Sequence, residues 1–344
     1  MKSLVLEEPN KLRLAQRPVP EPGIGDVLLR VVCTAICHTD LFTMEGGYKL
    51  GHPTVLGHEF SGIVEKCGPG VRNVKAGDRV TSFSFASCGT CPACREGWSV
   101  MCPDLRALPR ELEGSFQEKM IMPASSLFHV PATMGLDEAC LVEPASCAYN
   151  AVDKAAIQPG ETVAVIGAGP IGLFAVQAAA LRHPGKLIAV AKHQNQRHMA
   201  TKLGATHVVD VRKDDPCEVV DDLTGGRGVD AVIFCAGEER AWKQASSMLG
   251  IGGRFVVEAM PPTGTEQWPV PVMDFTQKVI SYIGASSYNA NQFSAVIGLI
   301  DSGKIDAKSL ITHRFSLDEY EEAFRMAGKA KDQAIKVIFE ISEE

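Results

Sequence analysis

The sequence predicts an α/β protein in which a compact, barrel-like β domain is combined with a domain built on a doubly wound parallel sheet. The chain has 344 residues, which is too long for one ordinary hydrophobic core. Residues 1 to about 130 contain short apolar runs separated by Gly and Pro, a pattern typical of a β barrel. The second half alternates strand-like apolar runs with helical segments, as parallel α/β sheets do.

The individual elements follow from local patterns. In the first half, strands are expected at residues 27–32, 60–64 and 78–81, and a short helix capped by Asp137 is expected at residues 136–144. In the second half, apolar runs predict strands at residues 162–166, 187–191, 231–235, 254–257 and 279–284. Residues 291–344 show two amphipathic helices and a final strand at 334–339, and we expect this tail to return to the first domain.

Composition excludes several classes of protein. Hydrophobic residues make up 45% of the chain and charged residues 22%, as in soluble globular proteins. The net charge of −7 argues against a nucleic-acid or membrane-surface partner. Residues 1–8 lack the apolar stretch of a secretion signal, and no run approaches the roughly 18 to 20 apolar residues of a membrane span. We therefore expect a cytoplasmic protein whose eleven cysteines are thiols or metal ligands.

One stretch places a thiol, an imidazole, a hydroxyl and a carboxylate at consecutive positions, Cys37, His38, Thr39 and Asp40. A thiolate such as that of Cys37 is a strong ligand for a borderline-soft cation such as zinc. Thr39 can pass a proton, and Asp40 can hold a histidine ligand in one tautomer. The alternative for Cys37, which ends an apolar run, is a buried thiol that acts as a small hydrophobic residue.

Further candidate ligands follow at His58 and Glu59 and, later in the chain, at Glu143. With Cys37 they offer a sulfur, a nitrogen and one or two carboxylate oxygens, which suits an open catalytic zinc site. Glu143 lies on an apolar stretch, where a charged carboxylate is costly unless it is paired or bound to a metal. Cys147 could share a helix face with it, as a buried thiol or a metal neighbour. The alternative for His58 and Glu59 is a solvated polar pair.

A second metal signal is a cluster of thiols with the spacing C-x2-C-x2-C-x7-C, at Cys88, Cys91, Cys94 and Cys102. Four thiolates can close a tetrahedral cage, which leaves no position for substrate, so such a site is structural and fixes a loop with little core of its own. An iron–sulfur cluster is the main alternative because Pro103 follows the last cysteine, but the final spacing is longer than that motif requires. Disulfides are a weaker alternative in a reducing compartment.

A glycine-rich turn lies between the apolar run at residues 162–166 and a helix-forming run at residues 173–180. The strand, turn and helix together match the dinucleotide-binding fingerprint far better than a lone glycine motif would. The turn reads Gly167-Ala168-Gly169-Pro170-Ile171-Gly172. We expect Gly167 to make the tight turn, Gly169 to admit the pyrophosphate and Gly172 to allow helix–strand packing. The alternative is an ordinary strand-to-helix turn of an α/β protein.

The next strand should end in an acid that binds the ribose 2′-hydroxyl of NAD. No Asp or Glu occurs between residues 161 and 210. The strand instead ends in a segment with cationic side chains, at Ala191, Lys192, His193 and Arg197. A cationic cluster at this position favours a 2′-phosphate and therefore NADP. The alternative is a basic surface patch in a protein that still accepts NAD.

Jointly, these motifs resemble the zinc-dependent medium-chain dehydrogenase/reductase family over nearly the whole chain. The resemblance implies a GroES-like catalytic domain at 1–148 and 287–344, with a structural zinc lobe at about 86–104, and a Rossmann domain at 149–286. It also implies two zinc ions per chain. Cys37 and His58, with Glu143 or Glu59, would bind the catalytic zinc. The cysteines of the cluster, Cys88, Cys91, Cys94 and Cys102, would bind the structural zinc.

Within this family, a glutamate at the Glu143 position is similar to the polyol and sorbitol dehydrogenase branch, whereas simple alcohol dehydrogenases carry Cys there. Ala191 departs from the Asp of most NAD-using members, which leaves NADP or NAD open. The implied activity is hydride transfer between the nicotinamide and a secondary alcohol or polyol, or the matching carbonyl compound. Zinc would act as a Lewis acid and Thr39 would relay the proton.

Several alternatives to this activity stay open. They are a threonine-type amino-alcohol dehydrogenase, a simple alcohol or aldehyde reductase, a zinc-free quinone or enone reductase, and a non-catalytic relative. The intact Cys37, His58 and four-cysteine set argues against the zinc-free reductase. His38 is either a neighbour of the cofactor phosphates or an exposed histidine. The partners expected are a small-molecule substrate and further copies of the chain in a homodimer or homotetramer, with no nucleic acid and no membrane.

Overall fold

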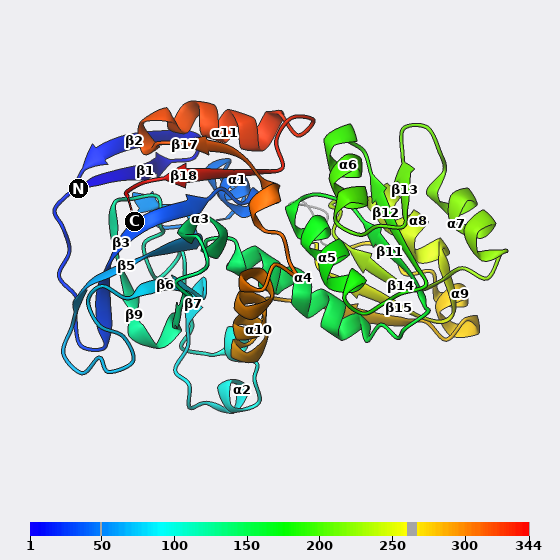
Figure 1. Cartoon of the computed structure of the whole chain (residues 1–344), viewed down its shortest axis with the longest axis horizontal. Coiled ribbons are helices and arrows are strands. Elements are labelled where there is room, and N and C mark those ends of the chain that lie inside the picture. The colour runs from blue at the N-terminus through cyan, green and yellow to red at the C-terminus, as the bar shows by residue number, and fades with distance from the viewer. Residues whose placement is uncertain (49, 260–266, 344) are drawn as a thin grey trace. The chain divides into compact units, whose positions relative to one another are not determined.

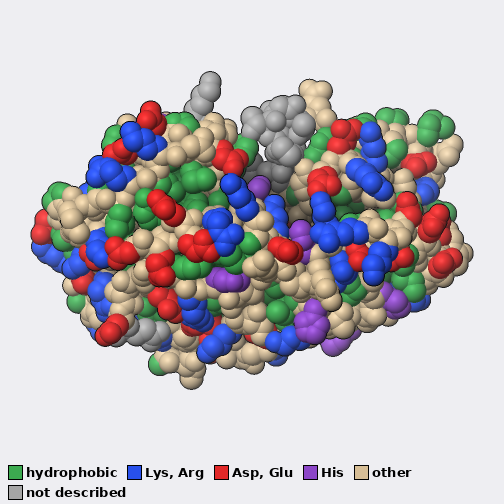
Figure 2. All heavy atoms as spheres, turned by 90° about the horizontal axis from the view of Figure 1, so that it is seen from above, with side chains coloured by type: hydrophobic (Ala, Val, Ile, Leu, Met, Phe, Trp, Pro, Cys, Tyr) green, Lys and Arg blue, Asp and Glu red, His purple; other side chains and the backbone are tan. Residues whose placement is uncertain are grey.

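The computed structural model describes residues 1–48, 50–259 and 267–343, and within them the chain forms two compact units. Unit 1 comprises residues 1–143, 289–303 and 307–344, and unit 2 comprises residues 144–288 and 304–306. The first boundary lies inside helix α4 (Val142–Ala155), a few residues before the expected position 148. In the described part of the chain, no helix is long and apolar enough to cross a membrane. Side chains of both charge signs are interspersed on the face drawn in Figure 2.

Unit 1 is built mainly on antiparallel strands, as expected of a barrel-like domain, although β17 and β18 pair in parallel. Its largest sheet has the order β10-β6-β5-β3-β18-β17, with β9 also paired to β3, and a smaller sheet has the order β2-β1-β4. The first strands of the unit are β1 (Lys2–Glu8), β2 (Lys11–Gln16), β3 (Asp26–Ala35), β4 (Thr54–Val55), β5 (Glu59–Cys67) and β6 (Arg79–Ser82). Further along lie β7 (Phe85–Ala86), β8 (Arg106–Ala107), β9 (Lys119–Pro123), β10 (Leu127–His129), β17 (Ile311–Phe315) and β18 (Lys336–Glu340).

Short helices and turns connect these strands. The α-helices of unit 1 are α1 (His38–Met44), α2 (Pro92–Arg95), α3 (Leu136–Ala139), α10 (Ala290–Asp301) and α11 (Tyr320–Lys329). The 3-10 turns are η1 (Ser99–Met101), η2 (Ala124–Ser126), η3 (Lys308–Leu310) and η4 (Leu317–Glu319). The expected helix cap was misplaced, because Gly135 is the N-cap of α3 and Asp137 lies in its first turn.

The C-terminal tail completes unit 1, as the sequence predicts. Strand β18 pairs antiparallel with β3, so that Ile338 lies opposite Ala35 (Figure 1). Helix α11 contributes apolar side chains to a core shared with β1 and β18, where the rings of Phe116 and Phe339 lie 5.3 Å apart. The aromatic ring of Phe293 on α10 packs against Phe128 with centroids 4.6 Å apart. Burial of these side chains therefore ties the end of the chain to its beginning.

Unit 2 contains the predicted parallel sheet, with the strand order β13-β12-β11-β14-β15-β16 and parallel pairing throughout. Its central strands β11, β12 and β14 are almost wholly buried and rich in Val, Ile and Ala, as parallel strands covered by helices must be. The strands are β11 (Thr162–Ile166), β12 (Lys186–Ala191), β13 (His207–Asp210), β14 (Val229–Phe234), β15 (Leu249–Val257) and β16 (Ser281–Gly284). Besides α4, the helices are α5 (Pro170–Ala180), α6 (Gln194–Lys202), α7 (Pro216–Thr224), α8 (Glu239–Ser247) and α9 (Val272–Gln277).

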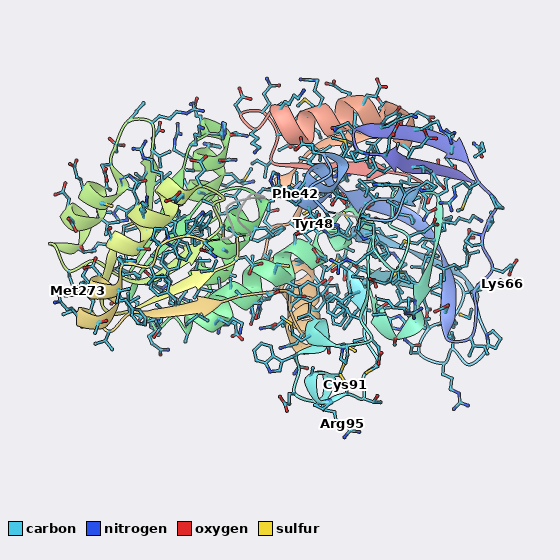
Figure 3. The ribbon with its side chains drawn as sticks, turned by 180° about the vertical axis from the view of Figure 1, so that it is seen from behind. Phe42, Tyr48, Lys66, Cys91, Arg95 and Met273 are labelled. Atoms are coloured by element: carbon cyan, nitrogen blue, oxygen red, sulfur yellow. The ribbon has the colours of Figure 1, made fainter. Side chains whose placement is uncertain are left out.

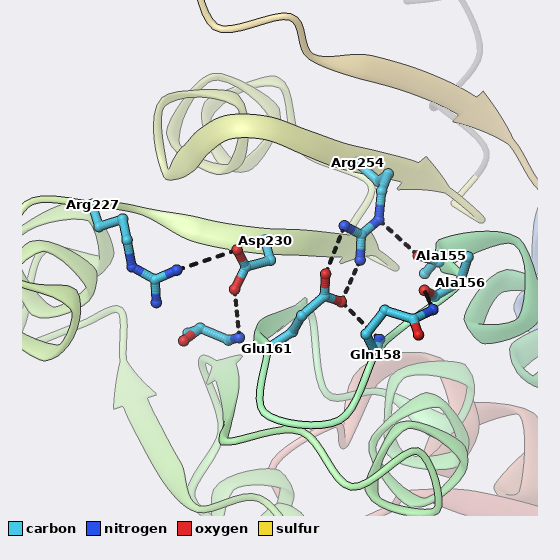
Figure 4. A network of polar contacts seen from close by, with 8 residues as sticks. Ala155, Ala156, Gln158, Glu161, Arg227, Asp230 and Arg254 are labelled. Atoms are coloured by element: carbon cyan, nitrogen blue, oxygen red, sulfur yellow. Dashed lines mark hydrogen bonds and ion pairs between the residues drawn. The ribbon is translucent and has the colours of Figure 1, made fainter.

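A polar network fastens the end of α4 to this sheet (Figure 4). Arg254 on β15 forms a two-pronged ion pair with Glu161, at 3.0 and 2.5 Å, and its Nε donates to the carbonyl of Ala155 at 2.8 Å. Asp230 accepts a hydrogen bond from the backbone N–H of Thr162 at 2.7 Å. Because the guanidinium group is planar, this bidentate geometry sets the position of the loop that leads into β11.

Candidate metal and cofactor sites

The pairing of two adjacent strands brings Cys37 and His58 together in unit 1. Strand β3 ends at Ala35 and the neighbouring antiparallel strand β5 begins at Glu59, and these two residues lie directly opposite each other. Cys37 therefore follows the end of one strand and His58 immediately precedes the start of the other. Since antiparallel neighbours lie about 5 Å apart, this register places the two side chains at the same edge of the sheet.

Asp40 joins the two segments that carry these residues. Its Oδ2 accepts a hydrogen bond from the backbone N–H of Cys37 at 2.9 Å, and its Oδ1 accepts one from the backbone N–H of Gly57 at 3.1 Å. The same Oδ1 lies 3.4 Å from His58 Nδ1. The carboxylate is only 1% exposed, so its contacts are not weakened by solvent. Asp40 thus stands where the sequence analysis expected a residue that orients a histidine ligand.

The environment of His58 favours a positive charge. Its Nδ1 is buried and has no well-aligned hydrogen bond within the described residues, although Asp40 Oδ1 lies 3.4 Å away. Burial alone would lower the pKa of His58, but the negative groups of Asp40 and Cys37 outweigh it and raise that pKa well above its usual value. A buried imidazole beside a thiol and a carboxylate is a donor set that fits a zinc ion.

A carboxylate completes this group. The ligand atoms of Cys37, His58 and Glu59 all lie within 4.8 Å of one another, and the latter two residues are buried. Glu59 also has a cationic neighbour, because Lys336 Nζ lies 2.5 Å from its Oε2, although the two groups are not aligned as a hydrogen bond. Both side chains are nearly inaccessible, at 4% and 1% exposure for lysine and glutamate. Strand β18 thus supplies a buried charge that the sequence analysis did not single out, although a lysine within an apolar strand was a usable signal.

We predict that Lys336→Met lowers the free energy of unfolding by about 3 kcal/mol, because it leaves the Glu59 carboxylate buried without its partner. The double variant Glu59→Gln/Lys336→Met should recover most of this loss, since it removes both charges. Urea denaturation of protein stripped of zinc by a chelator measures the effect, because Glu59 is itself a candidate zinc ligand. Lys66→Met is a matched control, because Lys66 pairs with Glu21 at an exposed position (Figure 3). A full-sized loss in the double variant would contradict the charge-pair explanation.

Four other predicted residues lie outside this ligand group. Glu143 is buried in the first turn of α4, and its carboxylate is not among the atoms that the structure groups within 4.8 Å. Helix α4 continues past Cys147, so this thiol does share a helix face with Glu143. Thr39 is half-buried on α1, where its carbonyl accepts a hydrogen bond from Thr43 Oγ1 at 2.7 Å. His38 is exposed at the first position of α1.

Two aromatic residues near this site, Phe42 on α1 and Tyr48 shortly after it, were not singled out by the sequence analysis. Phe42 and Tyr48 meet edge to face with ring centroids 5.0 Å apart (Figure 3). The pKa of Tyr48 is raised, mainly by burial and further by the charge of Cys37, against an opposing effect of Arg110. Tyr48 is therefore within electrostatic range of the metal-ligand candidates. Aromatic residues lack a spacing rule that would assign them to a pocket from sequence.

The four predicted thiols of the cysteine-rich lobe also lie close together. Ligand atoms of Cys88, Cys91, Cys94 and Cys102 all lie within 4.8 Å of one another, and none forms a disulfide. Backbone N–H groups point at the sulfurs, with Cys91 N donating to Cys88 Sγ at 3.4 Å and Cys94 N donating to Cys91 Sγ at 3.5 Å. The backbone N–H groups of Thr90 and Cys91 lower the pKa of Cys88 to about 6. Neither α2 nor η1 buries a residue, so a cation would replace the missing core of this lobe.

In unit 2, the predicted glycine turn has the backbone geometry of a dinucleotide-binding loop. Gly167 adopts a left-handed φ of 92°, and a Cβ on Gly172 would lie 1.8 Å from the carbonyl of Gly167. Only glycine fits this close contact between α5 and the end of β11. Gly169 is the N-cap of α5, followed by Pro170 at its first position, and no atom lies within 4 Å of a Cβ added to Gly169. The helix N-terminus is thus open to an approaching pyrophosphate.

The predicted cationic segment lies at the end of β12 in unit 2. Ala191 is the last residue of this strand, Lys192 is exposed, and His193 is the N-cap of α6. Arg197 lies one turn into α6 and forms an ion pair with Asp210 at 3.0 Å. No acid stands at the position after β12 where the ribose of NAD would be bound.

Comparisons with known proteins identify the family. Residues 23–132 match the model of the alcohol dehydrogenase GroES-like domain, and residues 170–302 match that of the zinc-binding dehydrogenases. A sorbitol dehydrogenase of Bacillus subtilis is 32% identical over 98% of this chain and 96% of its own. An L-threonine 3-dehydrogenase of Bacillus velezensis is 34% identical over 96% of each chain. A putative zinc-binding dehydrogenase of Sinorhizobium meliloti 1021, solved bound to NADP, is 32% identical, with a TM-score of 0.91 over 98% of each chain.

The three relatives match 96 to 98% of the chain, and they agree with both the glycine turn of unit 2 and the thiol-rich groups of unit 1. The expected fold class, a GroES-like domain together with a Rossmann domain, is confirmed. The chain belongs to the zinc-dependent medium-chain dehydrogenase/reductase family and is an NAD(P)-dependent alcohol or polyol dehydrogenase.

Proposed function

We propose that the protein transfers hydride between NADP(H), or NAD(H), and a secondary alcohol or polyol, with the matching ketone or aldehyde as the other partner of the reaction. The observation that carries this proposal is the group of Cys37, His58 and Glu59, whose ligand atoms lie within 4.8 Å. This set leaves room for one further oxygen ligand, which distinguishes it from the closed four-cysteine group. The relatives named sorbitol dehydrogenase and D-arabitol-phosphate dehydrogenase support a polyol substrate.

Each residue has a role in this proposal. Cys37 and His58 hold the catalytic zinc together with one carboxylate, from Glu59 or Glu143, while Asp40 orients the imidazole. Bound zinc would supply Lewis-acid stabilisation of an alkoxide, and the nicotinamide would supply the hydride acceptor. Thr39 Oγ1 receives the proton of the substrate hydroxyl and passes it toward solvent. Gly167 to Gly172 bind the pyrophosphate.

We further propose two zinc ions per chain and a preference for NADP. The second zinc is supported by the four thiols of Cys88, Cys91, Cys94 and Cys102. The preference for NADP is supported by Lys192 and His193 at the end of β12, by the absence of an acid there, and by the NADP bound to the Sinorhizobium meliloti relative.

A cofactor-coupled absorbance screen tests the proposed activity. Polyols, amino alcohols and simple alcohols are each offered with NADP and with NAD, and the expected result is the highest kcat/KM for a polyol with NADP. Metal analysis of the same sample should give two zinc ions per chain. A protein that contains both zinc ions and oxidises none of the polyols would contradict the proposed substrate class.

A second candidate is the oxidation of an amino alcohol such as threonine. It is favoured by one observation, the 34% identity to the L-threonine 3-dehydrogenase of Bacillus velezensis. The same screen separates the two candidates, because a threonine dehydrogenase should require the amino group and should show far lower kcat/KM for polyols.

We propose that the active form is a homo-oligomer and that unit 2 carries a contact between copies. Strand β16 is an edge strand, paired only with β15 in the described part of the sheet. Large apolar side chains are exposed around it, at Ile251, Val270, Val272, Met273, Phe275 and Val279 (Met273 in Figure 3). An open edge beside an apolar patch is a site where a second copy can add an antiparallel strand.

The oligomer has a direct test by light scattering. Wild-type protein should elute as a dimer or tetramer, and Ile251→Glu/Met273→Glu should dissociate it. Ile24→Glu is a matched control, because Ile24 is 86% exposed in unit 1. A monomeric wild type, or an unaltered mass in the double variant, would contradict this assignment.

A further inference from the structure

The carboxyl ends of β12 and β13 bring basic side chains from two separate segments together. Ala191, the last residue of β12, lies opposite Asp210, the last residue of β13, in parallel register. The residues that follow each strand therefore emerge side by side at the edge of the sheet where such folds bind their ligands. Lys192 and His193 follow β12, and Arg212 follows β13.

Arg197 is occupied in this arrangement. Its Nη1 donates a hydrogen bond to the carbonyl of Lys192 at 2.7 Å, and its Nη2 lies 3.0 Å from Asp210 Oδ2. Arg197 is 20% exposed and Asp210 is 13% exposed, so solvent screens this pair only partly. Its charge is cancelled by Asp210, and its donors hold the start of α6 against the end of β13. Arg197 therefore connects the start of α6 to the end of β13.

Arg212 differs from Arg197 both in its exposure and in the partners of its guanidinium group. It is exposed, and no carboxylate is paired with its guanidinium group anywhere in residues 1–48, 50–259 and 267–343. Its backbone N–H donates to Asp210 Oδ1 at 3.1 Å, which holds the residue beside the end of β12. Its Nη2 lies 3.4 Å from His193 Nδ1, so the guanidinium group reaches the segment that replaces the ribose-binding acid of NAD enzymes.

Resting on the proposed use of NADP, we propose that Arg212, and not Arg197, is the arginine that binds the 2′-phosphate. Its planar group can donate two parallel hydrogen bonds to phosphate oxygens, with Lys192 as a second positive charge. Arg197 acts indirectly by keeping Asp210 neutralised, because an unpaired carboxylate at this edge would repel the phosphate. The specificity of the site is thus divided between one arginine that contacts the ligand and another that cancels an adjacent charge.

Binding of 2′,5′-ADP and of 5′-AMP tests this division without any need for turnover. Isothermal titration of the full-length, zinc-loaded protein gives both dissociation constants, and their ratio isolates the contribution of the 2′-phosphate. Arg212→Gln should reduce the preference for 2′,5′-ADP roughly 10- to 100-fold and leave 5′-AMP affinity nearly unchanged. Lys213→Gln is the matched control, because it removes the same charge from the next exposed residue.

A charge-neutral variant separates the two arginines. The double variant Arg197→Gln/Asp210→Asn removes the Arg197–Asp210 ion pair without changing the net charge. It should keep the preference for 2′,5′-ADP over 5′-AMP within about threefold of the wild type and should lower the melting temperature. If Arg212→Gln keeps the wild-type preference, or if the double variant loses as much as Arg212→Gln does, the assignment to Arg212 is overturned. If wild-type protein does not discriminate between the two ligands, the NADP preference itself is wrong, and this inference is wrong with it.

Discussion

Replacing Cys37 by serine should lower kcat/KM at least a thousandfold with the best substrate of the screen. The expected loss corresponds to about 4 kcal/mol of transition-state stabilisation, at 1.36 kcal/mol for each factor of ten. A serine hydroxyl is a poor zinc ligand compared with a thiolate, and the loss of one ligand of three weakens both the binding and the placement of the ion. Zinc content should fall from two ions to about one per chain, measured by mass spectrometry alongside the kinetics.

The fold should survive this change. Cys37 is half-buried at the N-cap of α1, and the bond from its backbone N–H to Asp40 does not depend on its side chain. Cys217→Ser is a suitable control, since Cys217 lies on α7 in unit 2, away from both thiol groups, and its thiol donates to the carbonyl of Gln244 at 3.5 Å. Full activity in Cys37→Ser, with the circular dichroism of the wild type, would rule out the proposed metal mechanism.

Replacing Cys91 by serine should instead reduce stability. Cys91 is the N-cap of α2, where its sulfur accepts a hydrogen bond from Cys94 N. Serine is also a good N-cap, so the substitution keeps this capping interaction and removes mainly the metal ligand. Because the lobe buries little of its own, we expect zinc content to fall by one ion and the melting temperature to fall by roughly 5–10 °C.

Limited proteolysis localises the effect of Cys91→Ser. Arg95 is exposed in the same lobe (Figure 3), so trypsin should cut there sooner than in the wild type. Cys67→Ser, at a half-buried thiol outside the lobe, should change neither zinc content nor the cleavage pattern. Unchanged melting and two retained zinc ions in Cys91→Ser would exclude a structural metal at this lobe.

Much of the fold could be predicted because its signals are local. The strand, glycine turn and helix at residues 162–180 were expected at these positions, since Gly167 and Gly172 meet steric demands that no other residue meets. The strand at residues 186–191 and the final strand at 336–340 likewise follow from short apolar runs. The cap of α3 was wrong, because Asp137 and Gly135 are both acceptable helix starters and the choice depends on the path of the preceding chain.

The sequence named the candidate ligands of the metal group but not which carboxylate lies with the thiol and the imidazole. The types and order of Cys37, His58 and Glu59 indicated a zinc site, but the sequence left open whether Glu59 or Glu143 belongs to it. The register of β3 on β5 groups Glu59 with the other two, and the same residue is paired with Lys336 from the far end of the chain. Such a pairing has no sequence spacing of its own, because all the residues of unit 2 lie between β3 and β18 in the sequence.

The sequence by itself determined the local signals: the four-thiol spacing falls within residues 88–102 and the nucleotide turn within residues 167–172, where covalent geometry limits the outcome, and the residue types of Cys37, His58 and Glu59 indicated metal chemistry. Only the tertiary structure decided which charges meet. It paired Glu59 with Lys336 and Arg197 with Asp210, and it left Arg212 beside His193 with no acidic partner among the residues that the structure describes. Contacts between distant segments depend on strand register and packing, and these arise from the cooperative burial of many side chains, which no single motif encodes.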